Sequence, residues 1–358
     1  MTLLNNLSHA PQAVSQVQVS DARDLLSVIP YVLGYQPAEC LVVVCVRAGG
    51  RLGLVARADL TDVSRPLTGQ HLAELVAARA SEDHSLACCV VMYTAEVKAI
   101  TQTIRRIAAT FATALTGVVP NCESWLVGAG RYWSLDCADR QCCPAEGFNA
   151  EDLRDTLPAA QLVLAGIAPA SSREELYRIP PANPNRRDLA HRAAAVVKNE
   201  LRQATDEGCQ WRAQAVTDWR QATKCALRGI SPSAVLLGRL AVELADQEVR
   251  DAVLLWLAPG AAITEVVTGA IPASLSDPHV RAASLVLEQV VAHATPRRAL
   301  SSLTLLAFIA WWCGHGARAN FRVNEALRID PTEPLAMLLA ATLAAGLPPG
   351  WLRSPTKP

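Results

Sequence analysis

The sequence is poor in aromatic residues and has no excess charge of either sign. Aromatic side chains make up 5% of the 358 residues, and 33 basic residues balance 33 acidic ones. A protein built mainly to coat nucleic acid usually carries a basic excess, so the zero net charge argues against that class. The apolar half of the composition comes mostly from alanine, leucine and valine rather than aromatics, which favours a globular chain rich in helices.

Long hydrophobic runs are also missing. The most apolar stretch, residues 303–313, is too short to span a bilayer, and the first residues lack the basic and apolar segments of a signal peptide. Eleven cysteines are present, an odd number scattered through apolar runs. We therefore expect reduced thiols in a cytoplasmic protein that does not associate with a membrane.

The common nucleotide-binding and catalytic motifs do not occur. The sequence has no P-loop, no G-x-G-x-x-G, no G-x-S-x-G and no H-E-x-x-H. Gly128-Ala129-Gly130 follows a predicted strand, but Arg131 and its neighbours do not open a helix, so this segment fails as a dinucleotide site. No cofactor is predicted, and the sequence leans against an enzyme without deciding the question.

Apolar runs of strand length predict a sheet in the front half. Residues 40–46 are a continuous β-branched run, typical of a strand covered on both faces, and residues 51–60 alternate after a Gly49-Gly50 hairpin signal. Two further strands are predicted at residues 86–93 and from residue 124, with a helix over 97–115 between them. Strand, helix, strand implies a right-handed parallel crossover. We predict an α/β domain whose mixed sheet is largely parallel.

The back half shows only helical periodicity, interrupted by glycine and proline. The predicted organisation is a flexible tail (1–18), an α/β domain (19–168), a Pro-, Ser- and Asn-rich linker (169–187) and an all-helical domain (188–358). Ala319, Ala326 and Pro331 have the spacing of a second tetratricopeptide helix. The helical domain is therefore predicted to be a bundle or a short tetratricopeptide-like solenoid, with an ordinary helical hairpin as the alternative for its end.

Two N-terminal segments carry a family resemblance. Residues 24–47, followed by residues 57–60, and residues 131–147 resemble the actinobacterial family called domain of unknown function 4192, and residues 303–351 are similar to its tail. The resemblance covers nearly the whole chain. Cys40 and Cys45 stand where a serine and a glycine are usual in that family. The resemblance implies no particular activity.

Cys137, Cys142 and Cys143 form the densest sulfur cluster, three thiols within seven residues. They could bind a metal, although zinc wants four ligands and adjacent cysteine side chains tend to diverge. They could form a labile disulfide, with Arg140 lowering a thiol pKa. They could also be small residues that pin a turn against the sheet, with Trp133 packed on them, and this third interpretation is favoured.

Arg57, Asp59 and Arg131, with Trp133, form a second candidate constellation. If their strands are neighbours, these side chains lie near strand ends, where α/β sheets usually build ligand crevices. Guanidinium groups beside a carboxylate suit an anionic ligand, because their geometry matches phosphate or carboxylate. The favoured alternative is a salt bridge that holds one strand to another, since Arg57 and Asp59 share a face.

A basic segment runs from Arg186 to Arg228 and contains Trp211 and Trp219 on one helical face. Basic and aromatic residues together can contact nucleic acid, but a helical hairpin that buries its tryptophans is preferred. Three functions are therefore ranked. A binding scaffold with a protein partner comes first, an enzyme or sensor for a small anionic ligand second, and a thiol- or zinc-dependent regulator third.

Overall fold

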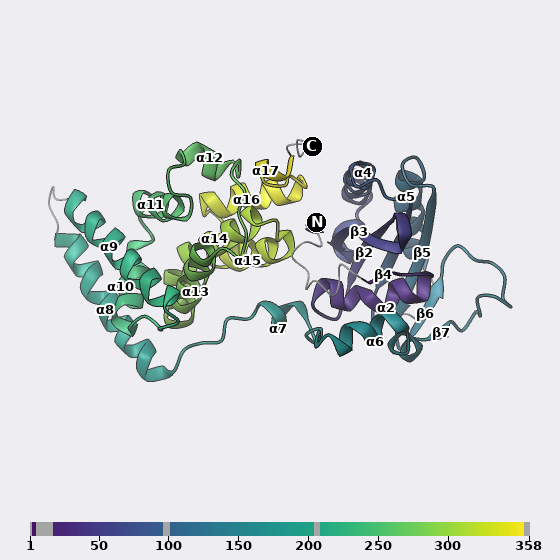
Figure 1. Cartoon of the computed structure of the whole chain (residues 1–358), viewed down its shortest axis with the longest axis horizontal. Coiled ribbons are helices and arrows are strands. Elements are labelled where there is room, and N and C mark those ends of the chain that lie inside the picture. The colour runs from purple at the N-terminus through teal and green to yellow at the C-terminus, as the bar shows by residue number, and fades with distance from the viewer. Residues whose placement is uncertain (1, 5–16, 96–100, 204–207, 354–358) are drawn as a thin grey trace. The chain divides into compact units, whose positions relative to one another are not determined.

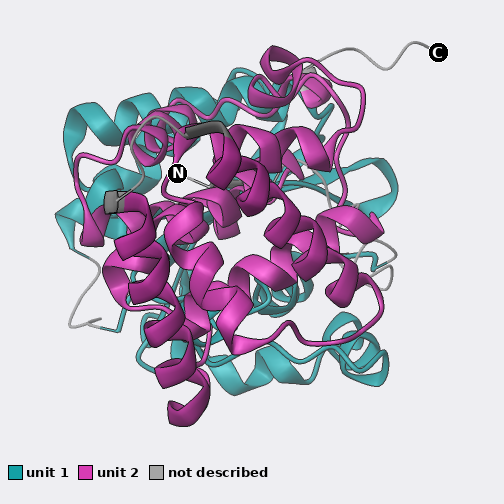
Figure 2. Cartoon of the chain, turned by 90° about the vertical axis from the view of Figure 1, so that its left-hand side faces the viewer, with its two compact units in different colours: residues 1–178 teal, residues 179–358 magenta. Residues whose placement is uncertain are grey.

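A computed structural model describes residues 2–4, 17–95, 101–203 and 208–353 of the chain (Figure 1). It divides into two compact units, Met1–Arg178 and Ile179–Pro358 (Figure 2). The boundary between them falls inside the predicted linker, residues 169–187. Of the predicted tail, residues 1 and 5–16 lie outside the described part, and Thr2–Leu4 form a strand.

The first unit is built on one mixed sheet with the strand order β1-β3-β2-β4-β5-β6-β7. The strands are β1 (Thr2–Leu4), β2 (Cys40–Arg47), β3 (Arg51–Asp59), β4 (Ala87–Tyr93), β5 (Asn121–Gly128), β6 (Arg131–Ser134) and β7 (Phe148–Asn149). The helices are α2 (Ala22–Leu33), α3 (Leu60–Val63), α4 (Pro66–Glu82), α5 (Gln102–Thr116), α6 (Leu157–Leu164) and α7 (Arg173–Tyr177), with short 3-10 helices η2 (Ala48–Gly50) and η3 (Ala150–Arg154).

The prediction of a largely parallel sheet is wrong, because antiparallel pairs dominate. Among the strands of the described residues, β4 and β5 alone pair in parallel, joined by α5 as the crossover rule predicts. The turn at Gly49 and Gly50 folds β3 back on β2, and β4 adds to the other side of β2 in the antiparallel sense. A second tight turn at Ala129 and Gly130 returns β6 antiparallel to β5.

Both faces of the sheet are covered, which explains the continuous apolar run of β2. Leu41, Val43 and Cys45 pack into the core beneath α4 and α5, whereas Val42 and Val44 pack on the opposite side, beneath α2 and α6. Figure 1 shows these two pairs of helices on opposite sides of the strands. A strand buried on both faces has no polar side to alternate with, so its sequence contains no period of two.

Helix α2 begins at a side-chain cap. The Asp21 carboxylate accepts a hydrogen bond of 2.8 Å from the backbone N–H of Asp24, which satisfies one free donor of the first turn. Pro30 lies inside the helix, and Gly34 closes the helix in the left-handed conformation, with φ of 80°. The chain then turns directly into Tyr35, which is buried against the sheet.

The second unit is helical throughout its described residues. Its helices are α8 (Pro184–Gln203), α9 (Gly208–Leu227), α10 (Ala234–Glu243), α11 (Gln247–Leu257), α12 (Ile263–Val267), α13 (Pro278–His293), α14 (Pro296–Trp312), α15 (Gly316–Ile329), α16 (Pro334–Ala344) and α17 (Gly350–Arg353). Nearly every residue of α14 from Ser302 onward is buried. The apolar stretch 303–313 is thus the centre of this unit's core.

Helices α14 and α15 pack on each other at the place where the repeat-like spacing occurs. Ala319 and Ala326 are fully buried on α15, so these small residues allow a close approach. The Nε1 atom of Trp312 donates to the carbonyl of Ile271 at 2.7 Å, which ties α14 to the loop after α12. In the described part of the chain, no helix combines the length and the apolar character needed to cross a membrane.

Candidate functional site

The strand order separates the arginines that were expected to share a pocket. Arg57 and Asp59 lie together at the end of β3, and their Nη1 and Oδ1 atoms are 2.6 Å apart. Arg131 begins β6, four strands away in the sheet. At about 4.8 Å per strand that separation is roughly 19 Å. One small anionic group therefore cannot contact both arginines.

Arg57 lies on the α2 face of the sheet and is only 8% exposed. Its strand neighbour Val42 and the adjacent Cys40 belong to the same apolar core, as does Tyr35, which is 2% exposed. Neither the Tyr35 hydroxyl nor the Arg57 Nε finds a hydrogen-bond partner among the described residues. The ion pair to Asp59, whose side chain is 47% exposed, therefore satisfies only part of the guanidinium group.

Burial and neighbouring charges determine the protonation states of Tyr35 and Cys40, which lie beside Arg57 in what we call the Arg57 corner. Burial raises the pKa of Tyr35 to about 12, although Arg57 and then Arg173 act in the opposite direction. Burial likewise raises the pKa of Cys40 against the attraction of Arg57. Both groups are therefore neutral near pH 7, and the Tyr35 hydroxyl is available as a donor.

Arg131 and Trp133 hold the base of the loop between β6 and β7. The Arg131 Nη1 donates to the carbonyls of Glu146 and Gly147 at 3.3 and 3.1 Å. Gly147 has φ of 76°, and a Cβ placed on it would lie 2.5 Å from the Nε1 of Trp133. Both predicted ligand residues of β6 therefore position this loop, which projects beyond the sheet in Figure 1.

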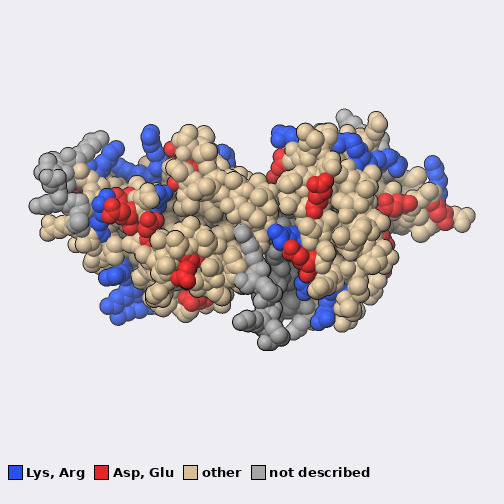
Figure 3. All heavy atoms as spheres, turned by 90° about the horizontal axis from the view of Figure 1, so that it is seen from above, with Lys and Arg blue, Asp and Glu red and all other residues tan. Residues whose placement is uncertain are grey.

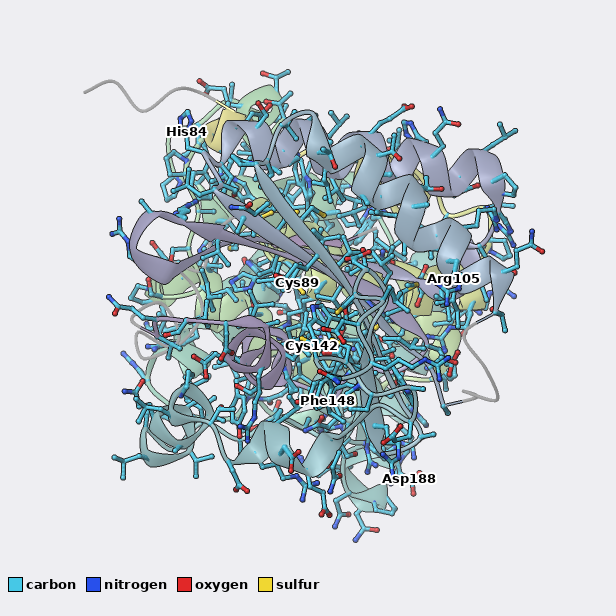
Figure 4. All side chains as sticks on the ribbon, turned by 90° about the vertical axis from the view of Figure 1, so that its right-hand side faces the viewer. His84, Cys89, Arg105, Cys142, Phe148 and Asp188 are labelled. Carbon is cyan, nitrogen blue, oxygen red and sulfur yellow. The ribbon has the colours of Figure 1, made fainter. Side chains whose placement is uncertain are left out.

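The same loop brings the thiols of Cys137, Cys142 and Cys143 together. Their three Sγ atoms all lie within 4.8 Å of one another, and those of Cys142 and Cys143 are 3.8 Å apart. The adjacent side chains, which were expected to diverge, therefore converge. Cys137 and Cys142 are exposed and Cys143 is half-buried. Figure 4 labels Cys142 on this side of the unit, together with Phe148 at the start of β7.

Hydrogen bonds within the loop produce this convergence. The N–H of Cys143 donates to the carbonyl of Asp139 at 2.7 Å, and the N–H of Gln141 donates to the Asp139 carboxylate at 2.9 Å. At the entrance, the N–H of Cys137 donates to the Ser134 hydroxyl at 3.1 Å. The resulting turn brings the side chain of Cys137 close to those of Cys142 and Cys143. Local backbone bonds of this kind preorganise the thiols, which lowers the entropic cost of binding.

The thiol of Cys143 keeps its proton near pH 7 when no cation is bound. Partial burial and the neighbouring thiols of Cys137 and Cys142 raise the pKa of Cys143 to about 12. Three thiolates at these separations repel one another strongly, so a bound metal has to displace their protons. Among the described residues, no fourth cysteine, histidine or carboxylate joins this group.

The basic segment from Arg186 to Arg228 forms two helices, α8 and α9, each packed against α10. Trp219 is 1% exposed, and Trp211 packs partly buried against the same core. Arg212 pairs with Asp246 and Glu248, both at 3.0 Å. Basic and acidic side chains are also interspersed over the face drawn in Figure 3. The tryptophans of this segment thus pack in the core, as expected for a helical hairpin that buries its tryptophans.

A cavity of about 510 Å³ lies between α4 and α5. The charged and amide side chains that line it have partners. Gln70 donates to Glu74 at 3.0 Å, and the Arg106 Nη2 donates to the carbonyl of Ser64 at 2.6 Å. Because these groups are satisfied within or beside the helices, this cavity offers less chemistry than the thiol loop or the Arg57 corner.

The sequence profile of one protein family matches residues 23–350, and that family is described as Domain of unknown function (DUF4192). No curated protein and no solved structure has a significant similarity to the chain.

Proposed function

The chain belongs to the family described as Domain of unknown function (DUF4192), and from its own residues we propose that it is a thiol-dependent metal-binding regulator. Its site is the thiol cluster, defined as Cys137, Cys142 and Cys143 on the loop between β6 and β7. The ion that best fits these ligands is Zn²⁺. The observation that carries the proposal is the convergence of three thiols within 4.8 Å.

The separations suit tetrahedral thiolate coordination. With Zn–S bonds of about 2.3 Å, two ligands of a tetrahedral site lie about 3.8 Å apart. The Sγ atoms of Cys142 and Cys143 are already 3.8 Å apart. A disulfide requires about 2.05 Å between sulfurs, much less than this separation. The Sγ of Cys137 lies within 4.8 Å of both other sulfurs.

Three protein ligands leave the fourth position of a zinc ion for water or an external ligand. Closed structural sites use four protein ligands, whereas sites that exchange ligands keep a position open. Exposure of Cys137 and Cys142 adds to this exchangeability. An open, surface-accessible site supports a reversible regulatory role better than a permanent structural one. The binding scaffold predicted from the helical periodicity stays a prediction, since no feature of the described residues of that unit identifies a partner.

The test is metal binding by the purified, reduced full chain. We expect a single Zn²⁺ ion to bind per chain with release of protons, and Co²⁺ to give thiolate-to-cobalt charge-transfer absorption. Cys142→Ser should weaken Zn²⁺ binding by roughly 100-fold, because a site worth about 10–16 kcal/mol with four ligands loses about a quarter of that with each ligand. A competition titration with a coloured chelator measures the affinities.

Cys225→Ser is the matched control, since Cys225 is a half-buried thiol of the helical unit outside the thiol cluster. It should leave Zn²⁺ affinity unchanged. Equal affinity of the wild-type chain, Cys142→Ser and Cys225→Ser, or no charge-transfer band with Co²⁺, would contradict the proposal.

Gly147→Ala should weaken Zn²⁺ binding by about tenfold while leaving all three thiols in place, the size typical of residues that orient metal ligands. The added Cβ would strike the Trp133 ring, and φ of 76° disfavours any side chain there. The loop must shift, and the thiols separate. Chelator competition measures the affinity, and thiol titration of the unfolded chain confirms that the cysteines are intact. Unchanged affinity would show that the loop base does not position the cluster.

A further inference from the structure

Two buried donors in the corner at the end of β3 lack hydrogen-bond partners among the described residues. They are the hydroxyl of Tyr35 and the Nε of Arg57, on side chains belonging to residues 2% and 8% exposed. An unsatisfied buried donor destabilises a protein by about 1–3 kcal/mol, and such donors are rare in native structures. Both donors point to a requirement for an acceptor in this corner.

The charges around the corner select the kind of acceptor. Arg57 and Arg173 both act electrostatically on the Tyr35 hydroxyl, while Asp59 is the carboxylate paired with Arg57. Arg57 and Arg173 therefore both contribute positive potential at the hydroxyl of Tyr35. In a site of low dielectric constant, this potential favours an anion over a neutral ligand. Guanidinium and phenol donors together match the oxygens of a carboxylate or phosphate.

We propose that this corner, bounded by Tyr35, Cys40, Arg57 and Arg173, binds a small oxyanion, the carboxylate or phosphate group of a small molecule. The corner lies where the start of β2 pairs with the end of β3, at Cys40 and Asp59, and the side chain of Asp59 is 47% exposed. Its residues are separate from the thiol cluster, so the inference stands without the metal site. Arg131, which the sequence grouped with Arg57, has no part in it.

Tyr35→Phe tests the inference because it removes one oxygen and no packing atoms. Without a ligand, the hydroxyl is buried and unpaired, so its loss should leave the thermal midpoint unchanged or raise it. With acetate or inorganic phosphate added at constant ionic strength, the wild-type midpoint should rise with anion concentration. The variant should bind the stabilising anion about tenfold to 100-fold more weakly, the effect of losing a hydrogen bond to a charged group.

Acetate and phosphate distinguish the two candidate ligand groups. Acetate should raise the thermal midpoint if the corner binds a carboxylate, and inorganic phosphate should raise it if the corner binds a phosphate group. Tyr132→Phe is the control, because Tyr132 is a 5% exposed tyrosine of the same core on β6, away from Arg57. It should respond to the anions as the wild-type chain does. The inference is overturned if neither anion stabilises the wild-type chain more than Tyr35→Phe, or if Tyr35→Phe is destabilised in their absence.

Discussion

Replacing Gly238 with alanine should lower the free energy of unfolding of the helical unit by about 3 kcal/mol. Gly238 lies on α10, and a Cβ built there would be 2.1 Å from the carbonyl oxygen of Ala190 and 2.7 Å from its Cα. These atoms are backbone of α8 and cannot rotate away, so the helices must separate. Alanine favours a helix by about 1 kcal/mol over glycine, so the measured loss understates the clash.

Urea unfolding followed by tryptophan fluorescence measures this loss. Six of the eight tryptophans lie after residue 178, so the signal reports chiefly on the helical unit. Val235→Ala provides the control, because Val235 lies on the same helix α10 and is 48% exposed. The control should change stability by no more than about 0.5 kcal/mol. A Gly238→Ala chain as stable as the wild type would mean that α8 and α10 are not in this close contact.

The elements of the first unit were predictable because each has a strong local pattern. The run from Cys40 onward and the alternation after Gly50 each depend on a few neighbouring residues. The strand order, in contrast, does not follow from neighbouring residues. The apolar pattern of β4 allows it to pair with β2 or with another strand, in either direction, and the choice is made by packing of α4 and α5 across the whole face. Directional pairing is a long-range property that no local pattern contains.

The same limit explains the division of the candidate sites. Arg57 and Arg131 were predicted to share a pocket on the condition that their strands are neighbours, but three strands lie between β3 and β6. Tyr35 was missed, since its only local signal is its place after the glycine that ends α2. The thiol cluster was found as a sequence feature, but the convergence of Cys142 and Cys143 depends on the backbone bond from Cys143 to Asp139. Spacing alone predicts no such turn.

A second large effect concerns Glu243, a carboxyl group 2% exposed on α10. The Arg239 Nη2 lies 3.3 Å from its Oε1, whereas its Oε2 has no partner among the described residues. Asp218 on α9, also buried, pairs with the same arginine at 2.5 Å, and Glu200 on α8 adds negative charge. Burial first, and then the repulsion from Asp218, raise the pKa of Glu243 to about 8, against the attraction of Arg239.

This raised pKa makes the stability of the helical unit fall as the pH rises. The folded chain holds the Glu243 proton up to about pH 8, whereas the unfolded chain releases it near 4.5. Stability is therefore lost across that window, and the loss is complete above it. Between pH 5 and pH 9 the contribution amounts to about 4 kcal/mol. Below pH 4.5 both states are protonated, and the group contributes nothing.

Glu243→Gln should remove this part of the pH dependence, because glutamine stays neutral and its amide can donate to the nearby Asp218 carboxylate. Urea unfolding at pH 5 should give similar stabilities for variant and wild type, and at pH 9 the variant should be the more stable by several kcal/mol. Glu248→Gln is the control, since the Glu248 side chain is 69% exposed beside Arg212, and it should follow the wild-type pH profile. If Glu243→Gln and the wild type lose stability in parallel from pH 5 to pH 9, then Glu243 does not titrate in this window, and the buried carboxyl pair is ionised throughout.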